Sequence, residues 1–279
     1  MCWSASAAHG SPQCTRPRRT TEKARLKKPV SGGTETDDLR LLHIGGRTAF
    51  VISGSGRIER VNDPDRTPGP RLSFSGCAQG NIVRVRHDVD DEIAARLIAV
   101  AAEEPPWRDP DALPRCLGKF IDILSADQRS VSVAPGITFE LPNGLKYEHS
   151  ATIVRGDTPD GAQMLARFAD QGVPQPMFDA GFKGVGDFWE PWCVAVERDE
   201  IASIAFAARL SDVGASIGVY TFPKFRAQGF AAAVTACWSS MPSLSGRALF
   251  YGTARSNRSS QRVVARLGLR LIGANVQID

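Results

Sequence analysis

The fold is decided by Tyr220-Thr221-Phe222-Pro223-Lys224-Phe225-Arg226-Ala227-Gln228-Gly229-Phe230-Ala231. This stretch follows an apolar run typical of a β-strand, residues 215–221, and opens an alanine-rich run typical of a helix, residues 231–238. A glycine turn that leads from a strand into a helix leaves several backbone N–H groups without partners and aims them at one point. Gly229 lets a ligand approach the backbone closely, and Ala231 adds little bulk. The stretch therefore predicts an anion site suited to a pyrophosphate.

A second motif follows at Asn257-x-x-Ser260, between a predicted strand, residues 248–253, and a predicted helix, residues 261–267. That helix ends in Leu-Gly-Leu, which leads into a last apolar strand. In this order, the motif and Arg226-x-x-Gly229-x-Ala231 resemble the acetyl-CoA site of the GNAT family of N-acetyltransferases. The resemblance covers residues 192–278, about a third of the chain.

The resemblance implies a mixed α/β fold, with a GNAT-like core in the C-terminal half and an N-terminal α/β accessory region. Its first strand would end near Arg155, one or two helices would lie between residues 158 and 182, and three antiparallel strands would precede Gly229. The two strands that flank the cofactor are expected to splay. The family usually has one more strand after the last one here, so either the core is short or a segment from residues 41–130 fills the edge of the sheet.

Composition and charge divide the chain into three predicted parts: a basic tail without structure (residues 1–40), an accessory region (41–145) and an acetyl-CoA-binding domain (146–279). Residues 1–34 hold seven Lys and Arg and one acid, Glu22, so this segment carries a formal charge of +6, whereas the whole chain carries +4. The rest of the chain is therefore near neutral, at −2, which argues against a nucleic-acid-binding body. A tail that binds nucleic acid or a membrane surface stays open as an alternative.

Ahead of the core, period-two runs predict strands and period-3.6 runs predict helices. The expected strands are residues 48–53, 56–61, 71–75 and 82–87, and the expected helices are residues 92–102 and 111–124. Residues 131–141 and 145–155 flank Pro142-Asn143-Gly144, which is typical of a β-hairpin.

The resemblance also assigns residues to the cofactor. They are Tyr220, Thr221, Phe222, Lys224, Arg226, Ala227, Gln228, Gly229, Phe230, Ala231, Asn257 and Ser260. The amides of the turn would hold the pyrophosphate, Lys224 or Arg226 would add positive charge, and the backbone of Phe222 would pair with pantetheine or serve as an oxyanion donor. Alternatively, Arg226 is a surface arginine, and Asn257 is a helix N-cap.

The catalytic acid and base are harder to assign. The position at which the family often has a tyrosine is Val264, so Tyr251 and Tyr220 are the candidate proton donors, with core packing as the alternative role. Carboxylates close to the core in sequence are the candidate bases: Glu190, Asp187, Glu197 and Asp212. Glu190 and Asp187 come first because they lie in a glycine- and aromatic-rich loop, where neighbouring aromatic rings can raise the pKa of a carboxyl group. A solvated loop acid is the alternative for each of them.

The predicted function is an acetyl-CoA-dependent N-acetyltransferase, an acyltransferase that passes the acetyl group directly to a primary amine in a ternary complex. The alternative is a catalytically weak acyl-CoA-binding regulatory protein of the same fold. The expected partner is a small-molecule or protein amine acceptor, and the sequence is compatible with a homodimer. No membrane partner is expected, and nucleic acid enters only through the alternative role of the basic tail. No apolar run approaches membrane-spanning length, and the six cysteines are expected to be reduced thiols, so we expect a cytoplasmic protein. The four histidines are scattered along the chain, so we expect no metal site.

Overall fold

The computed structural model describes residues 37–126 and 130–279, and these belong to one compact unit that runs from Asp37 to Asp279. The tail predicted for residues 1–40 therefore lies mostly outside the described residues, and helix α1 (Asp38–Ala49) begins just inside its boundary. Within the described ranges, no helix is both long enough and apolar enough to cross a membrane.

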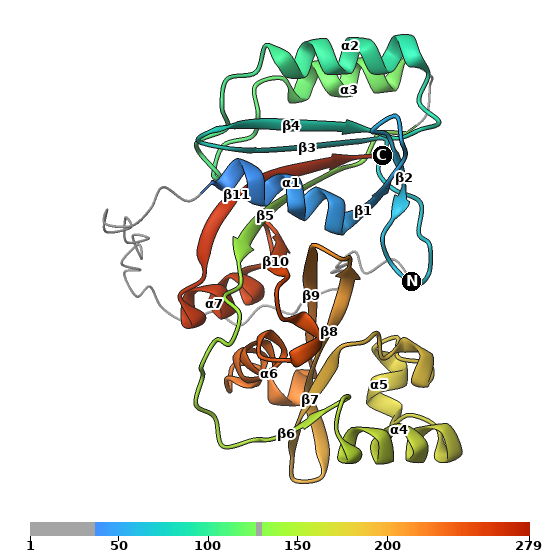
Figure 1. Ribbon diagram of the computed structural model, residues 1–279, viewed down its shortest axis with the longest axis vertical. Coiled ribbons are helices and arrows are strands. Elements are labelled where there is room, and N and C mark those ends of the chain that lie inside the picture. Colours follow the sequence, from blue (N-terminus) through green and yellow to red (C-terminus); the bar gives the residue numbers. More distant parts are fainter. Residues whose placement is uncertain (1–36, 127–129) are drawn as a thin grey trace, which may run out of the picture. The chain divides into compact units, whose positions relative to one another are not determined.

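Nine strands form one mixed sheet, in the order β4-β3-β11-β5-β10-β9-β8-β7-β6 (Figure 1). The strands of this sheet are β3 (Leu72–Cys77), β4 (Gly80–Val85), β5 (Val133–Glu140), β6 (Thr152–Arg155), β7 (Trp192–Glu197), β8 (Glu200–Leu210), β9 (Gly214–Thr221), β10 (Ala248–Ala254) and β11 (Arg270–Ile278). Strands β9 and β10 run parallel, and every other neighbouring pair among these strands is antiparallel. A separate antiparallel pair joins β1 (Phe50–Ile52) to β2 (Ile58–Val61).

Helices cover both faces of the sheet. Besides α1, they are α2 (Asp91–Ala102), α3 (Leu117–Ser125), α4 (Pro159–Gln171), α5 (Gln175–Asp179), α6 (Phe230–Ser239) and α7 (Arg258–Leu267). On β10, Leu249 and Tyr251 pack in the core cluster that contains α6, whereas Phe250 packs against Gly45 of α1. Successive strand residues point to opposite faces, so α1 and α6 lie on opposite sides of the sheet. The mixed α/β class predicted from the sequence is confirmed.

Strand β7, which lies next to the edge strand β6, is apolar on both faces. Trp192, Cys193 and Val194 are all fully buried. The Cys193 thiol donates to the carbonyl oxygen of Val234 in α6 (3.3 Å), while the Trp192 ring packs edge-on against Phe188 (5.2 Å between centroids) on the other face. A strand that is covered on both faces reads as a continuous apolar run rather than an alternating one.

The C-terminal half follows the predicted order. Strand β6 ends at Arg155, α4 and α5 occupy residues 159–179, and β7, β8 and β9 form an antiparallel series before the glycine turn. Helix α6, strand β10, helix α7 and strand β11 then follow.

Strand β5 corrects one prediction. It pairs with β11 along its length and with β10 over residues 136–140, so it lies between these two strands. The hairpin predicted around Pro142-Asn143-Gly144 is therefore wrong, because β10, β9, β8 and β7 separate β5 from β6. The chain turns along α6 instead, where Ser239 accepts the N–H groups of Gly144 (2.9 Å, to its carbonyl) and Leu145 (3.1 Å, to its hydroxyl).

Strand β5 also supplies the additional strand that the family usually has and that the sequence after β11 lacks. Residues 133–140, just beyond the range considered from the sequence, add the strand between β10 and β11, and β3 with β4 extend the sheet past β11. The sheet is therefore wider than the C-terminal half alone provides.

The remaining differences concern local boundaries. Residues 48–53 were predicted as a strand, but α1 runs to Ala49 and β1 has only three residues. Helix α1 begins where the Asp37 carboxylate accepts the N–H of Arg40 (2.8 Å), and Gly45 and Gly46 inside it conceal the helical pattern because glycine is a poor helix former. Helix α3 starts at Leu117 rather than 111, and residues 145–151 are not a strand.

Candidate functional site

The turn between β9 and α6 has the geometry that the glycine predicts. A short 3-10 turn, Pro223–Phe225, follows the strand, and the chain then adopts left-handed conformations at Ala227 (φ 64°) and Gly229 (φ 99°). Phe225 is buried, and its ring lies edge-on to that of Phe230 (5.7 Å between centroids), which ties the turn to the first residue of α6. Glycine adopts this left-handed conformation at the lowest free-energy cost of any residue, because it has no Cβ atom.

The backbone N–H groups that follow this turn are unpaired. Arg226 donates to the carbonyl oxygen of Pro223 (3.3 Å), and Ala233 donates to that of Gly229 (3.1 Å). Between them, the amides from Ala227 to Ala231 meet no acceptor among the described residues, and α6 has no side-chain cap. By contrast, Thr158 caps α4 in the ordinary way. Five unpaired donors at the positive end of a helix make a site for an anion.

The cations expected from the sequence are engaged elsewhere. Lys224 forms an ion pair with Glu200 (2.6 Å), and Arg226 donates from its Nε to the carbonyl oxygen of Thr221 (3.3 Å). Gln228 donates to the carbonyl oxygen of Lys224 (3.1 Å), which braces the turn. Lys224 and Arg226 are exposed, so these contacts leave them free to exchange with solvent or ligand.

Three other side chains surround Gly229, and the sequence did not point to them. A Cβ atom placed on Gly229 would lie 3.0 Å from the Tyr147 hydroxyl oxygen, 3.1 Å from an Arg266 guanidinium nitrogen and 3.2 Å from the His149 ring. Tyr147 and His149 belong to the segment between β5 and β6, and no local sequence motif predicts the path of that segment. The sequence held a weak indication of Arg266, because arginines recur every four residues, at positions 258, 262 and 266, and so form a basic face of α7.

Strands β9 and β10 part beside this turn, as expected for a cofactor gap. Their parallel pairing ends at Ser216 and Phe250, although both strands continue. The N–H of Phe222 donates to the carbonyl oxygen of Ala202 in β8 (3.1 Å), so this group is occupied and the expected oxyanion donor is not available there. Backbone groups alternate in direction along a strand, so those of Val219 and Thr221 face the gap instead.

Tyr220 of β9 and Phe222, just after the strand, pack against each other. The rings of Tyr220 and Phe222 lie edge-on at 5.1 Å, with Phe222 buried and Tyr220 half-buried. Tyr220 O accepts the Ser203 hydroxyl (2.9 Å). These contacts show packing for both side chains, while a role toward a ligand stays a prediction for Tyr220.

Asn257, Ser260 and Tyr251 come together at the start of α7. The Asn257 carboxamide oxygen accepts the N–H of Ser260 (3.1 Å), so Asn257 is the helix N-cap that was the alternative reading. The Tyr251 hydroxyl donates to the Ser260 hydroxyl (3.3 Å). Burial raises the pKa of Tyr251, so the phenol keeps its proton at neutral pH. Tyr251 is thus a protonated donor on the face of the sheet that carries α6 and α7.

The candidate bases lie in different surroundings. Asp187 accepts the N–H groups of Lys183 (2.6 Å) and Gly184 (3.1 Å), so its carboxylate braces its own loop. Glu190 is exposed, beside the buried Trp189. Glu197 lies near Arg198 (3.7 Å) in the turn between β7 and β8. None of these contacts tests a catalytic role.

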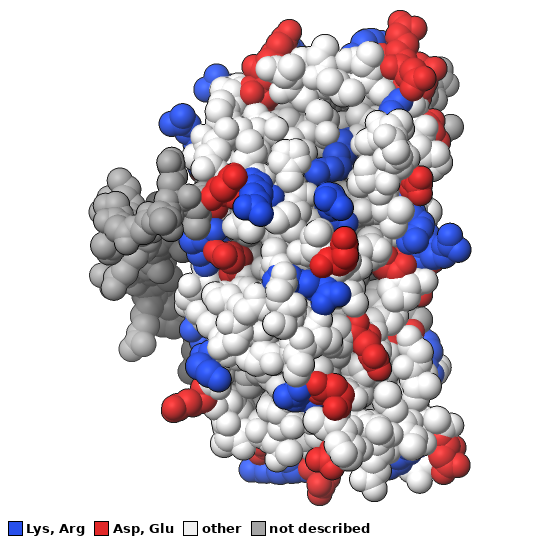
Figure 2. Space-filling view, in the orientation of Figure 1, with Lys and Arg blue, Asp and Glu red and all other residues white. Residues whose placement is uncertain are grey.

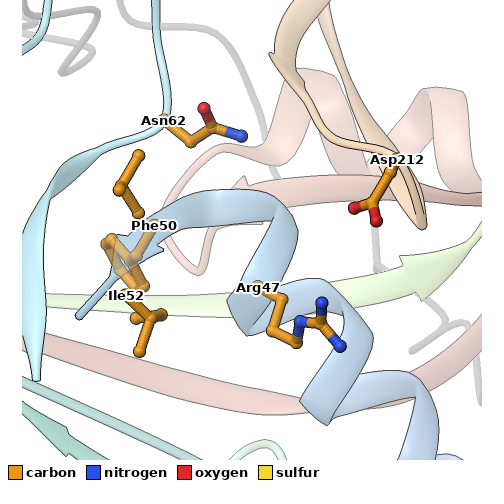
Figure 3. Close-up of a pocket in the computed structure, with 6 residues that line it drawn as sticks. Arg47, Phe50, Ile52, Asn62 and Asp212 are labelled. Atoms are coloured by element: carbon orange, nitrogen blue, oxygen red, sulfur yellow. The ribbon is translucent and has the colours of Figure 1, made fainter. Parts of the chain in front are cut away.

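Asp212 is the exception, because its position excludes it from the cofactor gap. It lies in the turn before β9, at the opposite end of that strand from Phe222, about 33 Å along an extended chain. Asp212 instead lines an open cavity of about 210 Å³ with Arg47, Phe50, Val51, Ile52 and Asn62 (Figure 3). This cavity contains none of the residues assigned to the cofactor.

The aromatic loop forms core rather than a pocket wall. Phe188, Trp189 and Trp192 are at most 8% exposed, and the indole of Trp189 packs edge-on against Phe206 (5.9 Å). The indole N–H of Trp192 has no partner among the described residues. The exposed apolar residues of this region are Phe178 and Val185.

Two cysteines lie where α6 meets β7. A hydrogen bond between their thiols raises the pKa of Cys193 and lowers that of Cys237. Cys193 is fully buried, and Cys237 is half-buried. Across the described ranges, no group of three or more His, Cys, Asp or Glu side chains is placed to hold a metal ion.

No family model matches the chain, and no curated protein matches it. Solved structures do resemble it. An acetyltransferase of the GNAT family from Colwellia psychrerythraea is 16% identical over 54% of this chain and 57% of its own, with a TM-score of 0.36. A GCN5-related N-acetyltransferase from Kribbella flavida is 15% identical over 88% of this chain and 96% of its own, with a TM-score of 0.41.

A GCN5-related N-acetyltransferase-like protein from Streptococcus suis is 15% identical over 78% of this chain and 86% of its own, with a TM-score of 0.43. The chain spans less than two thirds of some of these relatives: 57% of the Colwellia protein and 66% of a GNAT-family protein from Novosphingobium aromaticivorans. At such identities the likeness concerns the fold alone. Several structural neighbours of this chain are GNAT-family acetyltransferases, the family that its two motifs resemble.

Proposed function

We propose that the chain is an acetyl-CoA-dependent N-acetyltransferase that acts on a primary amine of a small molecule or a protein. The observation that carries the proposal is the row of unpaired amides from Ala227 to Ala231, placed where β9 parts from its parallel neighbour β10. The amides suit the pyrophosphate of CoA, and the gap between the strands suits the extended pantetheine arm.

When bound, acetyl-CoA supplies the thioester, and the protein binds and orients it. The amides of the turn hold the anionic end, and the backbone groups of Val219 and Thr221 face the gap in which the arm would lie. Fixing the thioester beside an amine makes the attack effectively intramolecular and removes much of its entropic barrier. A ternary complex, with direct attack by the amine, is the mechanism that this arrangement favours.

Proton transfers then fall to a small set of side chains. Because burial raises the pKa of Tyr251, its hydroxyl stays protonated, and this hydroxyl is the donor that we propose for the departing thiolate. The attacking amine must lose a proton, and Glu190 and Asp187 are the carboxylates that we propose for this step. Since Asp187 already accepts two backbone N–H groups, Glu190 is the freer of the two.

The alternative function is a catalytically weak acyl-CoA-binding regulatory protein. It is favoured by Val264, which stands where the family often has a tyrosine and cannot donate a proton, and by the engaged N–H of Phe222. Both functions require CoA to bind.

Turnover separates the two. Purified protein is incubated with acetyl-CoA and a panel of primary amines, the free thiol is measured with a chromogenic disulfide, and the acetylated amine is identified by mass. The proposed enzyme releases thiol in proportion to acetylated amine. Binding of acetyl-CoA without amine-dependent release of thiol identifies the regulatory alternative.

A further inference from the structure

The segment between β5 and β6, residues 141–151, forms a strap along α6. It leaves β5 at Leu141, whose N–H donates to the carbonyl oxygen of Leu249 (2.9 Å), and it is anchored by Gly144 and Leu145 on Ser239, the last residue of α6. From there it passes α6 and reaches β6 at the far side of the sheet (Figure 1). The strap is thus fixed at the C-terminal end of the helix and crosses toward its N-terminus.

At the N-terminal end of α6, one histidine holds the strap. The N–H of Ala151 donates to His149 Nδ1 (3.1 Å), so Nδ1 is the acceptor and Nε2 carries the proton that is donated to the carbonyl oxygen of Gln228 (3.1 Å). The His149 ring also lies 4.7 Å from the ring of Phe230. These two contacts join the strap to the glycine turn itself.

Between its two ends, the strap is loosely packed. An open cavity of about 180 Å³ lies beneath it, lined by Lys146, Tyr147 and His149 on one side and by Ala233 and Cys237 of α6 on the other. Lys146 is exposed. At the anchored end, Gly144 has a positive φ of 69° with open space around it, which suits a hinge.

The held strap occupies space that a ligand needs. The Tyr147 hydroxyl and the His149 ring both lie about 3 Å from the position of a Cβ on Gly229. A phosphate that accepts the amides of Gly229 and its neighbours needs the same shell of space, because donor and acceptor atoms lie about 3 Å apart and the phosphate extends beyond them. The strap and the ligand therefore compete.

We propose that the strap is an autoinhibitory latch: the CoA pyrophosphate enters its site only after Tyr147 and His149 swing away about Gly144. This inference rests on the proposed function, whose cofactor site it regulates. Where the closed strap predominates, the apparent Kd for the ligand equals the intrinsic Kd divided by the open fraction. Weakening the latch must therefore open the strap and tighten ligand binding by the same factor.

Limited trypsin digestion measures the opening, because Lys146 lies in the strap and the rate of cleavage there follows the open population. The fragment cut after Lys146 is quantified by mass in the wild-type protein and in His149→Phe, which keeps an aromatic ring but loses the hydrogen bond to Gln228 and the one accepted from Ala151 within the strap. Ser150→Ala is the matched control, since Ser150 is an exposed strap residue. Peptides of residues 141–151 with each substitution correct for the intrinsic cleavage rates.

Of these two bonds, only the one to Gln228 joins the strap to the glycine turn, and its loss corresponds to an increase of about fivefold in the open population. The latch predicts that His149→Phe raises the cleavage rate about fivefold and lowers the Kd for CoA, measured by calorimetry, by a similar factor. Ser150→Ala changes neither. Saturating CoA or inorganic pyrophosphate accelerates cleavage of the wild-type protein, because each displaces the strap.

Other outcomes overturn the latch. They are protection of Lys146 by bound ligand, binding with no effect on cleavage, or faster cleavage of His149→Phe without tighter binding. If inorganic pyrophosphate accelerates cleavage but CoA does not bind, the latch stands and the acetyltransferase proposal fails. If neither ligand binds even to His149→Phe, there is no anion site for the strap to block, and the latch proposal is wrong.

Discussion

Gly229 holds the turn in a conformation that other residues adopt with difficulty. We expect Gly229→Ala to lower the free energy of unfolding by about 1–3 kcal/mol, through the left-handed conformation and the crowding by Tyr147, His149 and Arg266. Gly246→Ala is the matched control, because Gly246 has a positive φ of 78° but open space around it. Urea denaturation of both variants measures the difference, and equal losses would mean that the crowding has no energetic effect.

Tyr251 allows a prediction about pH and catalysis. If its phenol protonates the leaving thiolate, Tyr251→Phe lowers kcat at least about tenfold and leaves the Kd for acetyl-CoA unchanged. Because burial raises the pKa of this tyrosine, the wild-type rate persists to higher pH than an ordinary phenol allows and then falls as the proton is lost. An unchanged kcat in Tyr251→Phe would leave Tyr251 with its packing role against Ser260.

At the scale of elements, α3 begins beside a buried thiol. Burial raises the pKa of Cys116 to about 12, and Glu104, which accepts the N–H groups of Cys116 (2.8 Å) and Arg115 (2.8 Å), adds to the effect. A raised pKa means that the folded protein favours the neutral thiol. The stabilising effect is therefore complete below pH 9 and is lost as the pH rises through 12. Urea denaturation between pH 8 and 10.5 should show a smaller loss of stability in Cys116→Ala than in the wild-type protein, and parallel curves would contradict this.

Elements also show where sequence reasoning succeeds. The turn at Gly229, the Asn257 helix and the order of strands after Arg155 are local patterns, so the sequence predicts them. The path of residues 141–151 is different, because Pro142-Asn143-Gly144 permits a hairpin and only tertiary contacts with Ser239 direct the chain along α6. For the same reason, no local signal placed His149 beside Gln228. The candidate site was thus predicted for its backbone and missed for the side chains that surround it.

At the scale of the whole molecule, β5 ties the two halves of the chain into one sheet. Strands β10 and β11 both pair with β5, so they would present unpaired edges without it. We therefore expect a fragment of residues 146–279, the acetyl-CoA-binding domain proposed from the sequence, to lack a cooperative thermal transition, whereas residues 37–279 unfold cooperatively. Circular dichroism and calorimetry of the two fragments make the comparison. A cooperative transition in the shorter fragment would show that its boundary is a true domain boundary.

Charge on the face of the molecule drawn in Figure 2 is mixed. Figure 2 shows basic and acidic side chains interspersed over one face, rather than gathered by sign. We expect the attraction for an anion to come from local geometry, that is, from the unpaired amides at the start of α6 and from nearby Arg266.

The central claim is that these amides bind the pyrophosphate of acetyl-CoA, and calorimetric titration of two variants tests it most directly. Ala231→Glu places a carboxylate beside the amides in the first turn of α6, where an acidic residue favours the helix and should not prevent folding. Ala231→Gln has nearly the same shape without the charge. If the amides bind the pyrophosphate, the glutamate weakens acetyl-CoA binding at least about tenfold relative to the glutamine. Equal affinities in two folded variants, or no binding by the wild-type protein, would contradict it.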